Sequence, residues 1–263
     1  MRWVVKTGSA TLSHSNGRLD YNAVERLVRQ IVDVKRRNNE VVLVTSGAIA
    51  AGVGRLGLSK RPTELKMKQS AAAIGQVVLM EAYERAFSRF KIVPAQILLI
   101  RDDLMNPKRR LNFQHTLHTL LSMNVVPIIN ENDTVSTDEI QFGDNDRLSA
   151  LVAVKIKADR LVLLSDVKGF YEVDRLGRLT DRVIPVVKNI TRPMLVKASK
   201  KQGSSMSVGG ISAKLTAAKL ATSHGIETWL TSGLDSQSLK KIVQGHPDAG
   251  TCFKAKPLNK KVA

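Results

Sequence analysis

An unusual concentration of carboxylates lies in the middle of this sequence. Six of its 23 acidic residues fall between positions 131 and 146, although the chain carries 41 Lys and Arg residues and a formal net charge of +18. Neighbouring carboxylates repel one another, and this costs stability unless cations compensate. A ligand ammonium group, a lysine or Mg²⁺ could supply that charge; the alternative is a solvated acidic loop with helix-capping Asp residues. The six are Glu131, Asp133, Asp138, Glu139, Asp144 and Asp146.

Two lysines stand where they could bind an anion. Lys6 ends a short apolar segment and is followed by Gly8, so its ammonium group could lie beside exposed backbone N–H groups. Without the other motifs, Lys6 would be interpreted as an ordinary lysine at the end of a strand. Lys214 follows Gly209 and Gly210, which let the backbone approach a phosphate at the N-terminus of a predicted helix. A cation is unfavourable in a first helical turn, which favours a functional partner for Lys214. Both lysines suit a transferring phosphoryl group, whose oxygens carry the developing charge.

The elements that must position these residues alternate between apolar strands and helices. Strands with fully apolar runs between helices indicate a mainly parallel sheet that is covered on both faces. The sequence therefore predicts an α/β fold, a three-layer αβα sandwich. Predicted strands span 3–5, 41–44, 92–100, 125–129, 161–164 and 226–230, with a possible edge strand at 251–253. Predicted helices span 20–37, an Ala-rich segment after 45–47, 64–90, 108–123, a segment that Asp144 or Asn145 caps and that runs on through 148–156, 214–223 and 236–243.

Polar residues follow several of these predicted strands. Ligands of such sheets bind at the carboxyl ends of the strands, so chemistry-bearing residues should stand there. Lys6, Ser46, the segment 130–133 and the pair Ser165 and Asp166 each end or follow a strand. We therefore expect these side chains to share one edge of the sheet.

Composition narrows the class of protein. The single cysteine, Cys252, excludes an internal disulfide and a cysteine-cluster metal site, and His115 and His118 lack the spacing of a zinc motif, so no protein-held metal is expected. No apolar run is long enough for a signal peptide or a membrane span, which predicts a cytoplasmic protein without membrane contacts. The basic residues are spread along the chain without interleaved aromatics, so a solvated basic surface is favoured over a specific nucleic-acid site.

One familiar motif is a false lead. Residues 52–57 fit the pattern GxGxxG, but they do not directly follow a strand and no acidic residue stands about 20 positions further on. These glycines are expected to end a helix, and any nucleotide site must be of another design because a Walker A sequence is absent.

Taken together, these segments resemble the amino-acid kinase superfamily and, within it, the glutamate 5-kinases. The resemblance covers roughly residues 4–253. It is carried by Val-Thr-Ser-Gly-Ala-Ile-Ala-Ala-Gly at 44–52, Asn-Glu-Asn-Asp at 130–133, Phe-Gly-Asp-Asn-Asp at 142–146, Leu-Leu-Ser-Asp-Val-Lys-Gly-Phe-Tyr at 163–171 and Gly-Gly-x-x-x-Lys at 209–214.

The resemblance implies a reaction and a role for each site residue. The γ-carboxylate of L-glutamate attacks the γ-phosphorus of ATP in line, giving glutamyl 5-phosphate and ADP in the first step of proline biosynthesis, and Mg²⁺ arrives with ATP. The implied catalytic residues are Lys6, Lys214 and Asp146, the last orienting the two lysines. The implied glutamate-binding residues are Ser46, Asp133, Asn145 and, near the same pocket, Asp144. The implied nucleotide-binding residues are Lys6, Gly8, Ser165, Asp166, Val208, Gly209, Gly210, Ile211, Ser212, Ala213 and Lys214.

The resemblance also implies an organisation and marks one departure. It predicts a single kinase domain over 1–263, with a glutamate-binding part at about 1–150, a nucleotide-binding part at about 151–255 and no C-terminal PUA domain, in a homo-oligomer (dimer or tetramer). Relatives usually carry Gly-Thr-Gly-Gly-Met before the second lysine, where this chain has Ser-Val-Gly-Gly-Ile at 207–211.

Two alternatives stay open from the sequence. One is a sibling kinase that acts on acetylglutamate, aspartate, carbamate or uridylate. The other is a degenerate kinase fold that serves as a basic binding or regulatory protein, an interpretation that the altered 207–211 segment and the +18 charge favour and that Lys6, Asp146 and Lys214 oppose.

Overall fold

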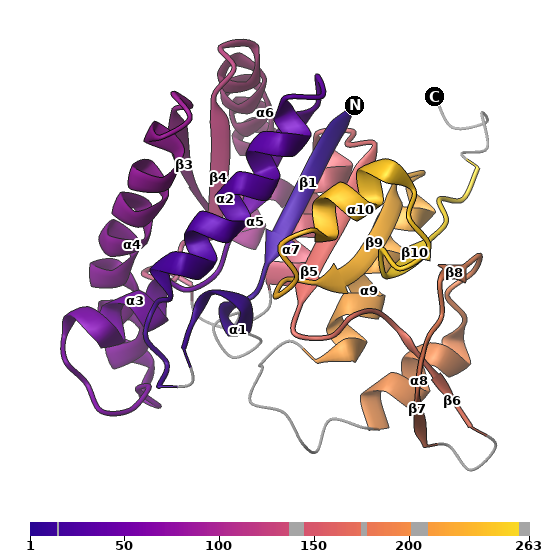
Figure 1. Cartoon of the computed structure of the whole chain (residues 1–263). Helices are drawn as coiled ribbons and strands as arrows, with labels where there is room; N and C mark the ends of the chain where they lie inside the picture. Colours follow the sequence, from indigo (N-terminus) through magenta and orange to yellow (C-terminus); the bar gives the residue numbers. More distant parts are fainter. Residues whose placement is uncertain (15, 137–144, 175–177, 201–209, 258–263) are drawn as a thin grey trace.

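An eight-stranded sheet forms the centre of the computed structural model, which describes residues 1–14, 16–136, 145–174, 178–200 and 210–257 (Figure 1). The strands lie in the order β3-β4-β2-β1-β5-β9-β10-β8, and each neighbouring pair is parallel except β9 and β10. The mainly parallel sheet is thus confirmed. Its strands are β1 (Arg2–Thr7), β2 (Glu40–Val44), β3 (Pro94–Leu99), β4 (Val126–Glu131), β5 (Arg160–Ser165), β8 (Val186–Val187), β9 (Glu227–Ser232) and β10 (Thr251–Phe253).

Helices cover both faces of this sheet and make the predicted three-layer αβα sandwich (Figure 1). Successive strand residues point to opposite faces, so Trp3 and Val5 pack in one core while Val4 packs in the other. The first core holds α1 (Ser9–Leu12), α2 (Tyr21–Lys35), α3 (Ala48–Arg55), α4 (Leu65–Ser88) and α10 (Ser238–Gln244). The second holds α5 (Arg101–Met105), α6 (Pro107–Ser122), α7 (Asn145–Lys155), α8 (Arg192–Lys200) and α9 (Ile211–Ser223).

All the predicted strands and helices occur, with ends that shift by a few residues. The strand 251–253 is not at the edge as expected, because the two-residue strand β8 pairs with its outer side. The sequence reasoning missed the short or exposed elements, whose burial pattern is too weak to reveal a period. These are α1, α5, α8, β8 and the small antiparallel pair β6 (Tyr171–Val173) and β7 (Leu179–Val183).

Helices α3 and α4 touch through their backbones at two glycines. A Cβ atom at Gly75 would lie 1.8 Å from the carbonyl oxygen of Ala48, and one at Gly52 would lie 1.9 Å from that of Ala71. Gly52 therefore lies inside α3 for packing and does not end it, contrary to the expectation for the 52–57 motif, whereas Gly57 follows the helix with a positive φ of 66°. The close crossing fixes α4 against the segment that leads into α3.

This crossing predicts a strong sensitivity of stability to one methyl group. Gly75→Ala should lower the free energy of unfolding by about 1–3 kcal/mol, because the two helices must separate to admit the Cβ atom. Gly54→Ala is the matched control in α3, since its Cβ would meet only the Arg18 side chain at 3.4 Å. The control should be neutral or stabilising by about 0.5–1 kcal/mol. Urea unfolding of both variants measures the difference, and equal midpoints would contradict the packing argument.

Candidate active site

The polar residues that follow strands come together at one end of the sheet. Lys6 lies in β1, Ser46 follows β2, Asn130 and Glu131 end β4, and Ser165 ends β5. These strands are parallel neighbours in the order β4-β2-β1-β5, so their carboxyl ends meet at the same edge. Helix α7 begins at this edge with Asn145 and Asp146, its first two residues.

A buried carboxylate joins the two lysines that the sequence singled out. The Asp146 side chain is fully buried; Lys6 Nζ lies 2.5 Å from its Oδ1 and Lys214 Nζ lies 3.2 Å from its Oδ2. Both lysines are themselves almost fully buried, at 4% and 7% exposure. Three residues from β1, α7 and α9 thus place two ammonium groups on one carboxylate. Two ammonium groups would otherwise repel each other, and the carboxylate between them offsets that repulsion.

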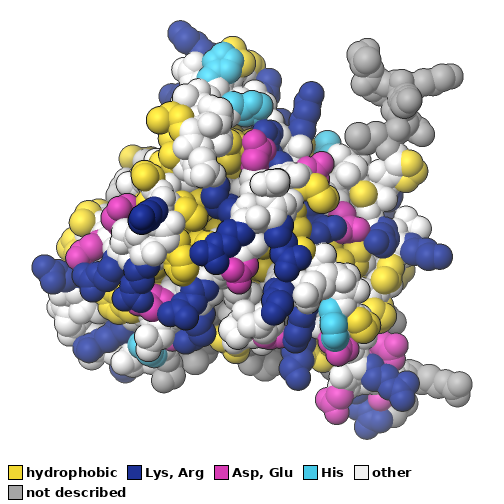
Figure 2. Space-filling view, turned by 45° about the horizontal axis from the view of Figure 1, so that its top comes forward, with side chains coloured by type: hydrophobic (Ala, Val, Ile, Leu, Met, Phe, Trp, Pro, Cys, Tyr) yellow, Lys and Arg dark blue, Asp and Glu magenta, His cyan; other side chains and the backbone are white. Residues whose placement is uncertain are grey.

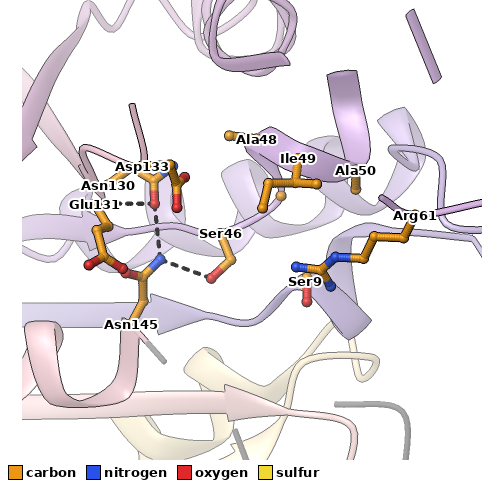
Figure 3. Close-up of a pocket in the computed structure, with 11 residues that line it drawn as sticks. Ser9, Ser46, Ala48, Ile49, Ala50, Arg61, Asn130, Glu131, Asp133 and Asn145 are labelled. Atoms are coloured by element: carbon orange, nitrogen blue, oxygen red, sulfur yellow. Dashed lines mark hydrogen bonds between the residues drawn. The ribbon is translucent and has the colours of Figure 1, made fainter. Parts of the chain in front are cut away.

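Asn145 is the centre of a second, uncharged network. Its Nδ2 shares two N–H groups among three acceptors, the carbonyl oxygen of Thr45 (2.6 Å), Ser46 Oγ (3.0 Å) and Asn130 Oδ1 (2.9 Å). Asn130 in turn donates to Gln76 Oε1 of α4 at 2.9 Å. The Thr45 carbonyl can only accept, so the amide orientation of Asn145 is fixed. The network holds Ser46 and Asn145 side by side (Figure 3).

The other amide atom of Asn145 is available for a ligand. Asn145 is only 7% exposed, yet its Oδ1 is buried and accepts no hydrogen bond from the described residues. A buried oxygen without a donor costs free energy until a donor reaches it. The oxygen therefore suits a ligand N–H or ammonium group.

A pocket opens beside this network, between the start of α3 and the end of β4 (Figure 3). Its half-buried Asp133 carboxyl has its pKa raised to about 6 by burial, which the nearby Arg61 guanidinium partly opposes. Burial disfavours the ionised form, and a bound cation would restore it. The lining residues are Ser9, Ser46, Gly47, Ala48, Ile49, Ala50, Arg61, Asn130, Glu131, Asp133 and Asn145.

The structure brings together three of the four predicted glutamate-binding residues, since Ser46, Asp133 and Asn145 all line this pocket. The fourth, Asp144, lies outside the described residues, as do Asp138 and Glu139 of the acidic cluster. Sequence reasoning placed Asn130 at this edge of the sheet, but it missed Arg61 and the Asn130 partner Gln76. A single Arg before a Pro and one of several polar positions in α4 carry no pattern that could have identified them.

The predicted nucleotide-binding residues lie at the ends of β1, β5 and the start of α9. Gly210 is the N-cap of α9 and offers no capping side chain, so the backbone N–H groups of Ile211 and Ser212 stand in an uncapped first turn, whereas that of Ala213 donates to the Gly210 carbonyl oxygen at 3.1 Å. Gly8 stands beside Lys6, since a Cβ there would lie 3.6 Å from the ammonium nitrogen. Val208 and Gly209 lie outside the described residues.

Ser165 and Asp166 stand apart from the pocket. The Ser165 hydroxyl donates to Asp166 Oδ1 at 2.8 Å, and neither residue lines the pocket of Ser46 and Asp133.

In the described ranges, no group of three His, Cys, Asp or Glu side chains is arranged to hold a metal ion. No helix in the same ranges is long and apolar enough to cross a membrane.

Comparison with known proteins identifies relatives along almost the entire chain. Glutamate 5-kinase from Moorella thermoacetica is 46% identical over 96% of this chain and 66% of its own length. Glutamate 5-kinases from Clostridium tetani and Clostridium perfringens are 43% and 44% identical over 96% and 97% of this chain, and over 94% and 96% of their own lengths. The chain thus spans about two thirds of the first relative and nearly all of the other two.

A solved structure shares the fold. Carbamate kinase from Giardia lamblia bound to AMP-PNP superposes with a TM-score of 0.64 over 97% of this chain and 98% of its own, at 16% sequence identity. The model of the amino acid kinase family matches residues 1–232. The chain belongs to the amino acid kinase family and, within it, to the glutamate 5-kinases.

Proposed function

We propose that this chain transfers the γ-phosphoryl group of ATP to the side-chain carboxylate of L-glutamate, the first step of proline biosynthesis. The observation that carries the proposal is the buried Lys6–Asp146–Lys214 cluster, because Asp146 directly follows Asn145, which lines a pocket with an acidic wall. The lysines supply charge for a phosphoryl group, and the acidic wall supplies a partner for the ammonium group of an amino acid. The similarity to glutamate 5-kinases along almost the entire chain supports the same reaction.

In the proposed mechanism a glutamate γ-carboxylate oxygen forms a bond to the γ-phosphorus while the bond to the β,γ-bridging oxygen breaks. ADP leaves with that electron pair, and no general base is needed because the nucleophile is already ionised. Lys6 and Lys214 neutralise the charge on the phosphoryl oxygens as it moves. Asp146 is a positioning residue, since it holds both ammonium groups in place before the substrates arrive.

The residues at the start of α9 fit a nucleotide. An uncapped helix N-terminus at Gly210 presents N–H groups that suit phosphate oxygens, and Lys214 joins that helix to the lysine cluster. Mg²⁺ would enter with ATP and share the phosphate charge, held mainly by the phosphates themselves. The division into a glutamate-binding part at about 1–150 and a nucleotide-binding part at about 151–255 remains a prediction.

The basic surface has a supporting role in this proposal. Figure 2 shows Lys and Arg side chains spread over the visible face, which is the distribution of a general attraction for anionic substrates. We therefore expect no specific nucleic-acid partner. A cytoplasmic location and a homo-oligomeric state, dimer or tetramer, also remain predictions, and light scattering would measure the latter.

The direct test is the release of ADP from MgATP in the presence of candidate acceptors. Glutamate should support turnover, and aspartate, N-acetylglutamate and carbamate should support little. Preference for N-acetylglutamate would assign the chain to a sibling activity. Absence of both ATP binding by calorimetry and ADP release with every acceptor would instead favour a kinase fold that has lost its activity.

The two lysines should be essential for turnover. Lys6→Ala and Lys214→Ala should each lower kcat about 100-fold or more, since an oriented charge on the transition state contributes roughly 3 kcal/mol. Each variant keeps one of the two ion pairs of Asp146, so a folded protein is expected. Lys219→Ala, an exposed position on the same helix, is the control and should retain kcat. Turnover close to that of the parent protein in either lysine variant would remove that lysine from the mechanism.

Asp133 should couple glutamate binding to pH. Its pKa of about 6 leaves it half protonated near pH 6, and the substrate ammonium group requires the ionised form. Glutamate binding should therefore release about half a proton at pH 6 and almost none at pH 8, and KM for glutamate should rise as pH falls below 6. Calorimetry in two buffers of different ionisation enthalpy measures the released protons.

The matching variant is Asp133→Asn, which keeps the size of the side chain and removes its charge. KM for glutamate should rise more than tenfold, as loss of a charged hydrogen-bond partner costs about 1.5–3 kcal/mol, while KM for ATP should change little. Proton release at pH 6 should vanish as well. A larger effect on ATP than on glutamate would place Asp133 in the other half of the site.

A further inference from the structure

The pocket beside Asn145 has one cationic side chain in its wall. Among the described lining residues, the charged ones are Arg61, Glu131 and Asp133, and the others are neutral. Arg61 belongs to the segment between α3 and α4, far from the acidic residues in sequence. In Figure 3 it lies on the side of the pocket opposite Asp133 and Asn145, next to Ser9. The two walls of the pocket therefore carry opposite charges.

The guanidinium of Arg61 is open to a ligand. The side chain is exposed, and within the described residues its guanidinium forms no ion pair or hydrogen bond. It does act on the pocket electrostatically, since it lowers the pKa of the Asp133 carboxyl against the effect of burial. Pro62 follows directly and restricts the Arg61 backbone to extended conformations, which limits where the side chain can reach.

The charges of the substrate account for this arrangement. Glutamate carries an α-ammonium group, an α-carboxylate and the γ-carboxylate that reacts. In the proposed reaction the γ-carboxylate faces Lys6 and Lys214, and the ammonium group faces Asp133 and the vacant acceptor Asn145 Oδ1. The α-carboxylate then remains without a partner, and a carboxylate removed from water needs one. A guanidinium matches a carboxylate with two parallel hydrogen bonds.

We propose that Arg61 binds the α-carboxylate of the substrate, so that Arg61 and Asp133 together select a free amino-acid head group. The inference rests on the proposed glutamate kinase function and adds a specificity-determining residue to it. Asp133 disfavours acceptors whose amino group is acylated, and Arg61 disfavours acceptors whose α-carboxylate is neutralised or missing. The γ-carboxylate of the substrate, which reacts, is bound by Lys6 and Lys214 instead.

The test compares two acceptors that differ only at the group in question. Glutamate and its α-carboxamide share the ammonium group and the γ-carboxylate, and only glutamate carries the α-carboxylate. The parent enzyme should prefer glutamate by roughly 10- to 100-fold in kcat/KM, the range expected for a charged hydrogen-bonded pair. Arg61→Ala should lose this factor for glutamate and leave the α-carboxamide nearly unchanged, so the preference should disappear. Arg61→Lys should keep part of it.

The control is Lys60→Ala, which removes the same charge from the neighbouring exposed position outside the pocket wall. It should retain the full preference for glutamate. Equal losses on both acceptors in Arg61→Ala would indicate a general structural effect and overturn the inference, as would an unchanged preference. A rise in KM for ATP with none for glutamate would place Arg61 at the phosphates and overturn it too.

Calorimetric binding separates this inference from the function on which it rests. If the parent protein binds glutamate more tightly than the α-carboxamide and Arg61→Ala loses that difference, but no ADP is released, the kinase proposal fails while the assignment of Arg61 survives. If it turns over glutamate and Arg61→Ala keeps the parent preference, the kinase proposal survives and the assignment of Arg61 fails. If the parent protein binds neither acceptor, both are rejected.

Discussion

The buried Asp146 carboxylate is the interaction on which the site depends. Removing an ionised carboxylate from water costs several kcal/mol unless cations and hydrogen bonds compensate. Here the compensation comes from Lys6 and Lys214, which lie 140 and 68 residues away along the chain. The ion pairs can form only when β1, α7 and α9 have their final arrangement. The two lysines can therefore take their places beside Asp146 only when the sheet, α7 and α9 are packed correctly.

The same arrangement explains why the lysines stand in unfavourable positions. Lys214 lies in the first turn of α9, where the helix dipole repels a cation, and Lys6 is buried in a strand at the centre of the sheet. Each position would be poor for a lysine that served only stability. Both become acceptable because Asp146 offsets part of their positive charge in the free protein and a phosphoryl group can bind them during the reaction. Lys6 and Lys214 therefore depart from the local residue preferences of strands and helix N-termini at the site where we expect function.

Much of this could be predicted from the sequence, for identifiable reasons. Runs such as 41–44 are apolar on both faces, which marks a buried parallel strand, and polar residues directly after such strands must meet at one edge. Lys6, Ser46, Asn130 and Ser165 followed from that rule. The hydrogen bond between Asn130 and Gln76 did not, because it joins residues 54 apart whose separate patterns carry no signal. Arg61 was missed for the same reason: its role depends on what faces it across a pocket. The short strand β8 was missed because two residues cannot show a period.

The packing of α4 links these unpredicted residues to the predicted ones. Gly52 and Gly75 allow α3 and α4 to touch, and that contact sets the distance from α4 to Thr45, which follows β2, and to Asn130 near the end of β4. From this position Gln76 reaches Asn130, and the buried Tyr83 hydroxyl lies 2.7 Å from Thr45 Oγ. Thr45 and Asn130 are two of the three hydrogen-bond partners of Asn145, so the contact between α3 and α4 and two polar side chains of α4 support the geometry of the pocket. Helix α4 contributes no residue to the pocket lining, yet a shift of this helix would alter the pocket. Hydrogen bonds between amide groups tolerate little displacement before they are lost.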